Sequence, residues 1–334
     1  MRVFNSPHDN TPSGLFRCRR HSIFLVLALG VALGSAQPAR AGSLTFNLTF
    51  DASTAAAPAG FFTAFNDAIQ FYQTTYSDPI TINLHVGWGE INGGSLQPGL
   101  LGESRTNQRG FFTYDQMKTA LTNDATSAAD ATAIANLPAA DPTGGANFVM
   151  SNAEAKALGL LAGNAAGIDG FVGFLTTAPY TFDPNNRAVA GDFDFIGLAE
   201  HEISEVMGRY GLGQNGAATG RYSPIDLFRY TSQGVLDLTP ENGAYFSIDG
   251  GATVINTFHC TSGGDLSDWL GTTPDSFNET LTRGQALPVS AGDITEMDAI
   301  GFDLATPEPA TQALFSLGIA ALLFLRRQMA RSLL

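Results

Sequence analysis

Basic residues are scarce in the central part of this chain, and their scarcity argues against several kinds of partner. Residues 42–306 contain 9 Lys and Arg against 29 Asp and Glu, which gives a net charge of 9 − 29 = −20. Nucleic acid and anionic lipid attract proteins mainly through basic side chains, so a segment this acidic is a poor partner for either. The charge is consistent with high solubility or with binding of divalent cations.

Cysteine is also nearly absent. The chain has two cysteines, Cys18 and Cys260, and Cys18 lies in an N-terminal segment that we expect to be removed. A single cysteine cannot form an internal disulfide, so the hydrophobic core has to stabilise the fold. About 265 residues are enough to form such a core. We interpret Cys260 as a small buried hydrophobic residue rather than as a reactive thiol.

The N-terminal segment has the three parts of a secretory signal peptide. A basic cluster at 17–20 precedes an apolar run at 23–33, and small residues end at Ala41, where we expect cleavage. The run is shorter than the roughly 20 apolar residues that a membrane-spanning helix needs. We therefore predict a signal peptide over 1–41, an exported protein, and a folded domain over 42–305.

The C-terminal segment has a second apolar run. Pro307-Glu308-Pro309 is followed by an apolar stretch at 310–325 and by a basic cluster beginning at Arg326. From physics alone this is a short transmembrane anchor with positive charge on the cytoplasmic side. The pattern closely resembles the PEP-CTERM sorting tail of Gram-negative bacteria. That resemblance implies recognition of residues 306–334 by an exosortase-type membrane enzyme, and delivery to the cell surface or extracellular matrix. Membrane contact is expected only through the terminal segments.

The order of predicted elements indicates one α+β domain with a mixed sheet and a loop-rich C-terminal lobe. Hydrophobic periodicity predicts strands at 44–50, 80–89 and from 168, and helices at 59–76, 114–136 and from 151. Ser151 and Glu154 form a capping-box pattern at the last of these helices. Short strands and Gly/Asp loops follow to about residue 285, and a final helix is predicted to begin at Gly292 or Asp293.

A helix predicted over 195–209, capped by Asp192 or Asp194, contains the main chemical signal, His201-Glu202-x-x-Glu205. Positions four apart lie on one face of a helix, so His201 and Glu205 can bind one ion. Glu202 points about 100° away around the axis, which suits a base acting on metal-bound water. The pattern predicts a Zn²⁺ site with His201 and Glu205 as ligands and Glu202 as the catalytic base. The alternative is an exposed charged helix without a metal.

The chain resembles a family of PEP-CTERM-tailed metalloproteases with an HExxE motif, which are distantly similar to matrixin and other metzincin-like enzymes. The resemblance rests on ITINLHVGWGEI, GLAEHEISEVMGR, SPIDLFRY, GGDLSDW and ITEMDAIGFD. It implies a metzincin-like zinc endopeptidase that hydrolyses peptide bonds by Glu-assisted attack of zinc-bound water. Gly208 matches the metzincin glycine that follows the helix. Gly211 stands where the third metzincin histidine would be, and no methionine between Gly208 and Glu296 could form a Met-turn.

The third ligand has few candidates, because only His85, His201 and His259 lie in the central part of the chain. His85 alternates with polar residues along a strand and is interpreted as a surface residue. Asp226, in SPIDLFRY, follows the helix where a returning segment would pass beneath the metal, and the resembling family has the same string. We choose Asp226 over His259 as the third ligand.

A site with two carboxylates and one imidazole would neutralise Zn²⁺ more fully than three imidazoles, leaving a weaker Lewis acid. Tyr222 or Tyr230 could donate a hydrogen bond to the oxyanion, although packing is the favoured role of each. Asp265 and Asp268 flank a turn with oxygen ligands suited to Ca²⁺, but without a full calcium-loop pattern we interpret them as solvated surface.

Two functions are consistent with the sequence. The first is a zinc endopeptidase that acts on protein or peptide substrates. The second is a non-catalytic surface or matrix protein whose metal site only stabilises the fold. Glu202 favours the endopeptidase, because a purely structural metal site does not require an additional carboxylate.

Overall fold

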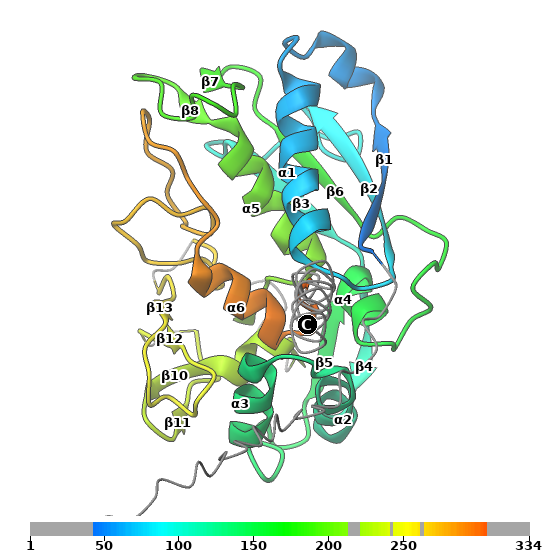
Figure 1. Cartoon of the computed structure of the whole chain (residues 1–334), viewed down its shortest axis with the longest axis vertical. Coiled ribbons are helices and arrows are strands. Elements are labelled where there is room, and N and C mark those ends of the chain that lie inside the picture. The colour runs from blue at the N-terminus through cyan, green and yellow to red at the C-terminus, as the bar shows by residue number, and fades with distance from the viewer. Residues whose placement is uncertain (1–42, 213–220, 241–242, 261–263, 306–334) are drawn as a thin grey trace, which may run out of the picture. The chain divides into compact units, whose positions relative to one another are not determined.

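The computed structural model describes residues 43–212, 221–240, 243–260 and 264–305 (Figure 1). The predicted signal peptide and sorting tail lie outside these residues. Within the described part of the chain, no helix is both long enough and apolar enough to cross a membrane. The described residues form a mixed α+β fold, as the sequence predicts.

The main sheet has four strands in the order β1-β2-β6-β3. Three strands run parallel: β1 (Thr45–Phe50), β2 (Thr81–Trp88) and β6 (Gly170–Phe174). The fourth, β3 (Gly102–Thr106), is antiparallel to β6 and forms an edge of the sheet. The predicted alternation of β2 is confirmed, because its inward-facing apolar side chains are buried, namely Ile82, Leu84, Val86 and Trp88.

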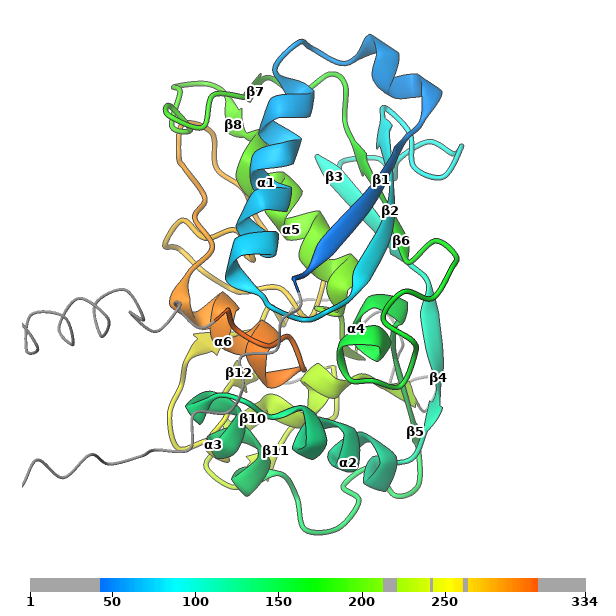
Figure 2. The same ribbon diagram turned by 45° about the vertical axis from the view of Figure 1, so that its right-hand side comes forward.

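Helices α1 (Phe61–Thr75) and α5 (Phe195–Met207) pack side by side against the main sheet (Figures 1 and 2). Asp194 caps α5 by accepting a hydrogen bond from the backbone N–H of Ile196. Every residue of α5 is buried, so the alternative of an exposed charged helix is wrong. A sheet, a neighbouring helix and the loops of the C-terminal lobe enclose α5 on all sides, and its polar residues therefore have to find partners inside the protein.

One predicted helix is divided into two in the structure. Instead of one helix over 114–136 there are two, α2 (Tyr114–Asp124) and α3 (Ala128–Asn136). Ser127 forms a capping box with Asp130, which starts a new helix and so divides the segment.

The capping box predicted at α4 (Asn152–Ala157) forms only in part. Ser151 accepts a hydrogen bond from the backbone N–H of Glu154. The Glu154 carboxyl does not return the bond, since it is buried beside the turn at Gly208.

The remaining described strands are short and form three smaller sheets. A three-stranded sheet joins β4 (Gln108–Phe112), β5 (Asn147–Ser151) and β9 (Arg221–Tyr222). A second sheet has the order β11-β10-β12-β13, with bounds Val235–Leu236, Arg229–Ser232, Tyr245–Phe246 and Asn256–Thr257. Strands β7 (Tyr180–Thr181) and β8 (Phe193–Asp194) precede α5 in the chain and pair with each other.

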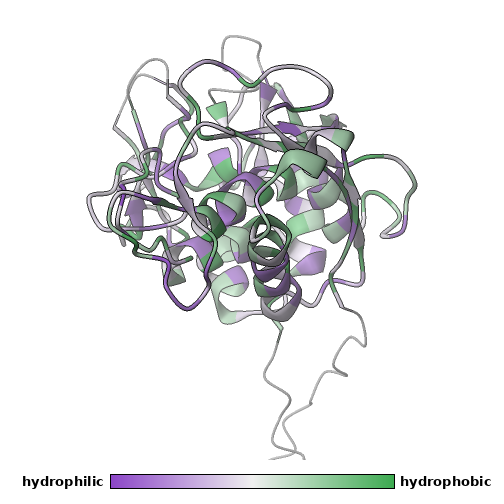
Figure 3. Cartoon of the chain, turned by 90° about the horizontal axis from the view of Figure 1, so that it is seen from above, coloured by the Kyte–Doolittle hydropathy of each residue, from purple (hydrophilic) through white to green (hydrophobic). Residues whose placement is uncertain are grey.

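Within SPIDLFRY, residues Pro224–Phe228 form a 3₁₀-helix rather than a strand. The last helix, α6 (Ala291–Ala299), begins after Ser290, close to the predicted start. Figure 3 shows hydrophilic residues interspersed with hydrophobic ones on the helices at the centre of the fold. Many of the buried polar residues are acidic, and two of them, Glu205 and Asp268, lie close to His201 in the C-terminal half of α5.

Candidate metal centre

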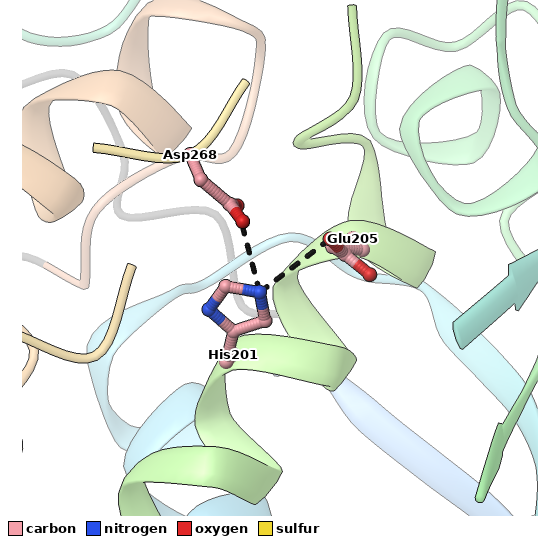
Figure 4. Close-up of side chains that lie close together, drawn as sticks. All are labelled: His201, Glu205 and Asp268. Atoms are coloured by element: carbon pink, nitrogen blue, oxygen red, sulfur yellow. Dashed lines mark ion pairs between the residues drawn. The ribbon is translucent and has the colours of Figure 1, made fainter. Parts of the chain in front are cut away.

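Three side chains with metal-binding atoms converge at α5. His201 and Glu205 come from successive turns of the helix, and Asp268 comes from the loop segment between β13 and α6 (Figure 4). The Nε2 atom of His201 lies 3.5 Å from Oε1 of Glu205 and 3.5 Å from Oδ1 of Asp268. The three donor atoms all lie within 4.8 Å of one another.

The spacing of these atoms fits a zinc ion. Zinc bonds to nitrogen and oxygen are about 2.0–2.1 Å long, and in a tetrahedral site such bonds place neighbouring donor atoms about 3.3–3.4 Å apart. The two distances from His201 are close to that value. Calcium prefers six to eight oxygen ligands, so one imidazole and two carboxylates suit it poorly. The residues present therefore fit Zn²⁺ better than Ca²⁺.

The orientation of His201 is set by a backbone contact. Its Nδ1 atom lies 2.8 Å from the carbonyl oxygen of Ser276. A carbonyl can only accept a hydrogen bond, so Nδ1 carries a proton and Nε2, which faces the two carboxylates, is the nitrogen that a metal would bind. Hydrogen bonding of the second ring nitrogen to a carbonyl is typical of histidine metal ligands.

The edge strand β3 holds Glu205. The hydroxyl of Ser104 donates a hydrogen bond of 2.6 Å to Oε2 of Glu205, and the hydroxyl of Thr106 donates to the Glu205 backbone carbonyl at 3.2 Å. Since Ser104 occupies Oε2, the other oxygen, Oε1, is the one directed at His201. The hydrogen bond from β3 thus determines which oxygen of the Glu205 carboxylate faces His201.

Glu202 lies beside the donor group without belonging to it. On β3, Gly102 lies against Glu202, because an added Cβ atom there would collide with the Glu202 carboxylate. Burial raises the pKa of Glu202 well above its usual value, and the nearby negative charge of Glu205 raises it further. Tyr180 is close enough for Glu202 to raise the tyrosine pKa, after the larger effect of burial. Its hydroxyl donates to the carbonyl of Leu101 at 3.0 Å.

Electrostatic coupling within the group is strong. Burial disfavours the charged form of His201, but Asp268 and Glu205 outweigh that effect and raise its pKa to about 10. Burial likewise disfavours the Glu205 carboxylate, but His201 and Arg209 outweigh it and lower the pKa of Glu205 to about 2. Without a metal, a proton on His201 balances the carboxylates. A divalent cation would take the place of that proton, so metal binding is expected to release it.

Arg209 is part of this centre, although the sequence did not indicate it. Gly208 ends α5 with φ of 145°, a conformation that favours glycine, and Arg209 follows directly. The buried guanidinium donates from Nη1 to Oδ1 of Asp268, and its Nη2 lies 3.7 Å from Oε1 of Glu205. Arg209 stands four positions after Glu205, a spacing at which opposite charges can pair, but only the folded chain brings it to Asp268.

Glu279 is a second residue that the sequence did not indicate. Burial raises its pKa to about 8, and the Asp268 carboxylate, which forms a hydrogen bond with it, contributes to the same shift. Its Oε2 atom also accepts a hydrogen bond from the backbone N–H of Asp265 at 3.0 Å. A protonated Glu279 can therefore donate a hydrogen bond to Asp268.

The structure does not bring Asp226, the predicted third ligand, into the donor group. Its Oδ1 accepts a hydrogen bond from the backbone N–H of Leu212 at 3.1 Å, and its Oδ2 accepts one from that of Ser223 at 2.8 Å. Both oxygens thus stabilise the segment that returns after α5. An added Cβ atom at Gly211 would lie 2.7 Å from Oδ1. Asp226 is close to the end of the helix, but its role is structural.

Asp268 supplies the third donor instead, which corrects its interpretation as solvated surface. The exposed fractions of His201, Glu205 and Asp268 are 7 %, 7 % and 3 %. The sequence pattern did not indicate Asp268 as a ligand, because an Asp in a Gly/Asp loop is usually solvated. A buried cation, Arg209, is what permits this one to be buried.

The remaining candidates lie outside the donor group. His259 donates its backbone N–H to the Asp268 carbonyl at 2.7 Å, but its ring lies beside Gly264. His85 is half-buried and forms an ion pair with Asp51 rather than being fully exposed. Tyr222 packs on Phe148, Tyr230 is buried in β10, and Cys260 is half-buried, so packing is the observed role of both tyrosines.

Comparison with known proteins finds no match to this chain among protein-family models, curated proteins or solved structures. The interpretation of the centre therefore depends on its own geometry. That geometry comprises three donor atoms within 4.8 Å of one another, an additional carboxyl group beside them, and an arginine that donates a hydrogen bond to Asp268 and forms an ion pair with Glu205.

Proposed function

We propose that this protein is an exported zinc-dependent endopeptidase whose metal is held by His201, Glu205 and Asp268. The observation that carries the proposal is the presence of Glu202, a carboxyl beside the three donors but outside their group. Zinc bound there would supply a Lewis acid that polarises a carbonyl and acidifies a water molecule. A metal site that only stabilises a fold has no need of the additional carboxyl.

Glu202 is assigned the role of general base and acid. In its ionised form Glu202 can accept a proton from the attacking water, and it can later return the proton to the leaving amine. Gly102 leaves the space that the Glu202 carboxylate occupies. The residue before it, Leu101, has its carbonyl bonded to Tyr180, which fixes the start of β3 beside Glu202.

The sheet edge favours a peptide as the substrate. Strand β3 pairs with β6 on one side, and no other described strand pairs with it. An exposed strand edge can bind an extended peptide through backbone hydrogen bonds. Because β3 contacts both Glu202 and Glu205 through Gly102 and Ser104, a peptide bound along it would pass close to the centre.

A second candidate is a surface or matrix protein with a structural metal site. The deep burial of the three donors favours this candidate, since structural zinc sites are closed and catalytic sites keep an open position. The two candidates differ in what they require of Glu202.

The test compares the wild-type protein with Glu202→Gln. We expect equal zinc content by elemental analysis and a loss of casein cleavage of about 100-fold or more, because a general base contributes about 10²–10⁴ to the rate. Glu90→Gln is the matched control: Glu90 bonds Ser53 and Gly93, away from the centre, and its substitution should leave cleavage unchanged. Bound zinc without cleavage by the wild type would support the structural candidate, and absence of zinc would refute both.

A further inference from the structure

Arg209 contacts the donor atoms themselves, not merely the residues that bear them. Its Nη1 bonds Oδ1 of Asp268, and the same oxygen lies 3.5 Å from Nε2 of His201. Its Nη2 faces Oε1 of Glu205, again the oxygen that lies 3.5 Å from His201. The guanidinium and a bound metal would therefore share the same two oxygens.

The position of the guanidinium is fixed by further contacts. Its Nε donates to the hydroxyl of Ser204 at 2.7 Å, and Nη1 also donates to the Ser267 carbonyl at 3.4 Å. One face of the guanidinium lies 4.5 Å from the ring centre of Phe277. Arg209 is fully buried, so its charge is weakly screened by solvent and acts on the centre at close range.

The contact with Arg209 changes the net charge at the proposed metal site. One neutral imidazole and two carboxylates carry a charge of −2, which would cancel that of a divalent cation and weaken it as a Lewis acid. A guanidinium on the same oxygens withdraws part of their charge. The centre then has a net positive charge of one unit when the metal is bound.

We propose that Arg209 is a positioning residue that tunes the metal, an inference that rests on the proposed zinc site. It lowers zinc affinity by competing for Asp268 and Glu205, and it keeps the zinc a stronger Lewis acid for peptide hydrolysis. A merely structural arginine would have the opposite effect on affinity, because its loss would disorder the ligands and weaken binding.

The experiment compares Arg209→Gln with Arg209→Lys in the full-length exported protein. Both side chains are shorter than arginine and both can donate to Asp268, but only lysine retains the charge. Zinc affinity is measured by competition with a chromophoric chelator, and turnover is measured at full zinc occupancy. We expect Arg209→Gln to bind zinc about tenfold more tightly than Arg209→Lys and to turn over about tenfold more slowly. Equal or weaker zinc binding by Arg209→Gln would overturn the inference.

Arg209→Gln removes one of the positive charges beside two buried carboxylates, so the variant is prepared in the presence of zinc. If it does not fold even then, Phe277→Leu serves instead, because it keeps the charge but removes the ring that holds the guanidinium. We expect Phe277→Leu to bind zinc about two- to threefold more tightly, and an unchanged or lower affinity would refute the inference. Zinc binding by the wild type without peptide cleavage would refute the proposed enzyme while leaving this test of Arg209 intact.

Discussion

Oδ1 of Asp268 lies 3.5 Å from Nε2 of His201, although the two residues belong to distant segments of the chain. The contact closes a donor group of which α5 provides only two members. It also means that the centre depends on the correct docking of the C-terminal lobe onto α5.

Asp268 and Asp226 form a matched pair for testing the third ligand. Asp268→Asn should reduce zinc affinity by about 100-fold or more, since loss of even a supporting residue typically costs 10- to 100-fold. Asp226→Asn should retain zinc and lower the free energy of unfolding by about 1 kcal/mol, because one backbone hydrogen bond to Leu212 or Ser223 is weakened. Elemental analysis and urea unfolding measure the two effects. Zinc loss in Asp226→Asn alone would restore the assignment made from the sequence.

Gly102→Ala should impair catalysis without removing the metal. The new methyl group would collide with the Glu202 carboxylate and displace it, so we expect a drop in the rate of peptide cleavage of about tenfold or more at unchanged zinc content. Gly243→Ala is the control, because an added Cβ atom there has no neighbour within 4 Å. Full activity in Gly102→Ala would show that the position of Glu202 is not critical.

Ser104→Ala should weaken zinc binding about 10- to 100-fold. The substitution removes the hydrogen bond to Oε2 of Glu205 and lets the carboxylate rotate away from His201. Thr74→Ala, which removes an exposed hydroxyl bonded only to carbonyls of α1, controls for loss of a hydroxyl and should leave affinity unchanged. Chelator competition measures both variants, and equal affinities would argue against a role for β3 in holding the ligand.

Asp298, at the end of α6, should make stability depend on pH. Burial raises the pKa of Asp298 from 3.8 to about 7, and the negative charges of Asp130 and Asp303 contribute. In the unfolded chain the group ionises near its ordinary value, so folding favours the protonated form. Its contribution to stability is complete below about pH 4 and is lost as the pH rises to about 7, by about 4 kcal/mol at most.

Asp298→Asn keeps the side chain neutral at every pH and should remove this dependence. We expect its urea unfolding midpoint to change less between pH 4.5 and pH 7 than that of the wild type. Asp115→Asn, on the exposed start of α2, should follow the wild type. Parallel pH profiles for all three proteins would refute the assignment to Asp298.

Three features that local sequence determines agree with the structure. Asp194 caps α5, and the helical period places His201 and Glu205 on one face with Glu202 turned aside. The apolar alternation of β2 identifies its buried face. Each of these features depends on residues only a few positions apart, so hydrogen-bond geometry and periodicity suffice to predict them.

Other features depend on contacts between distant segments, and the linear order of residues does not encode them. Asp226 and Asp268 are both aspartates in loop-rich segments after the helix, and their local patterns do not distinguish a ligand from a structural group. The structure distinguishes them by the groups that contact their oxygens. Backbone N–H groups donate hydrogen bonds to both oxygens of Asp226, whereas Asp268 forms ion pairs with His201 and Arg209. A carboxylate is buried only where a positive charge or donors balance it, and the tertiary fold alone brings Arg209 to that position.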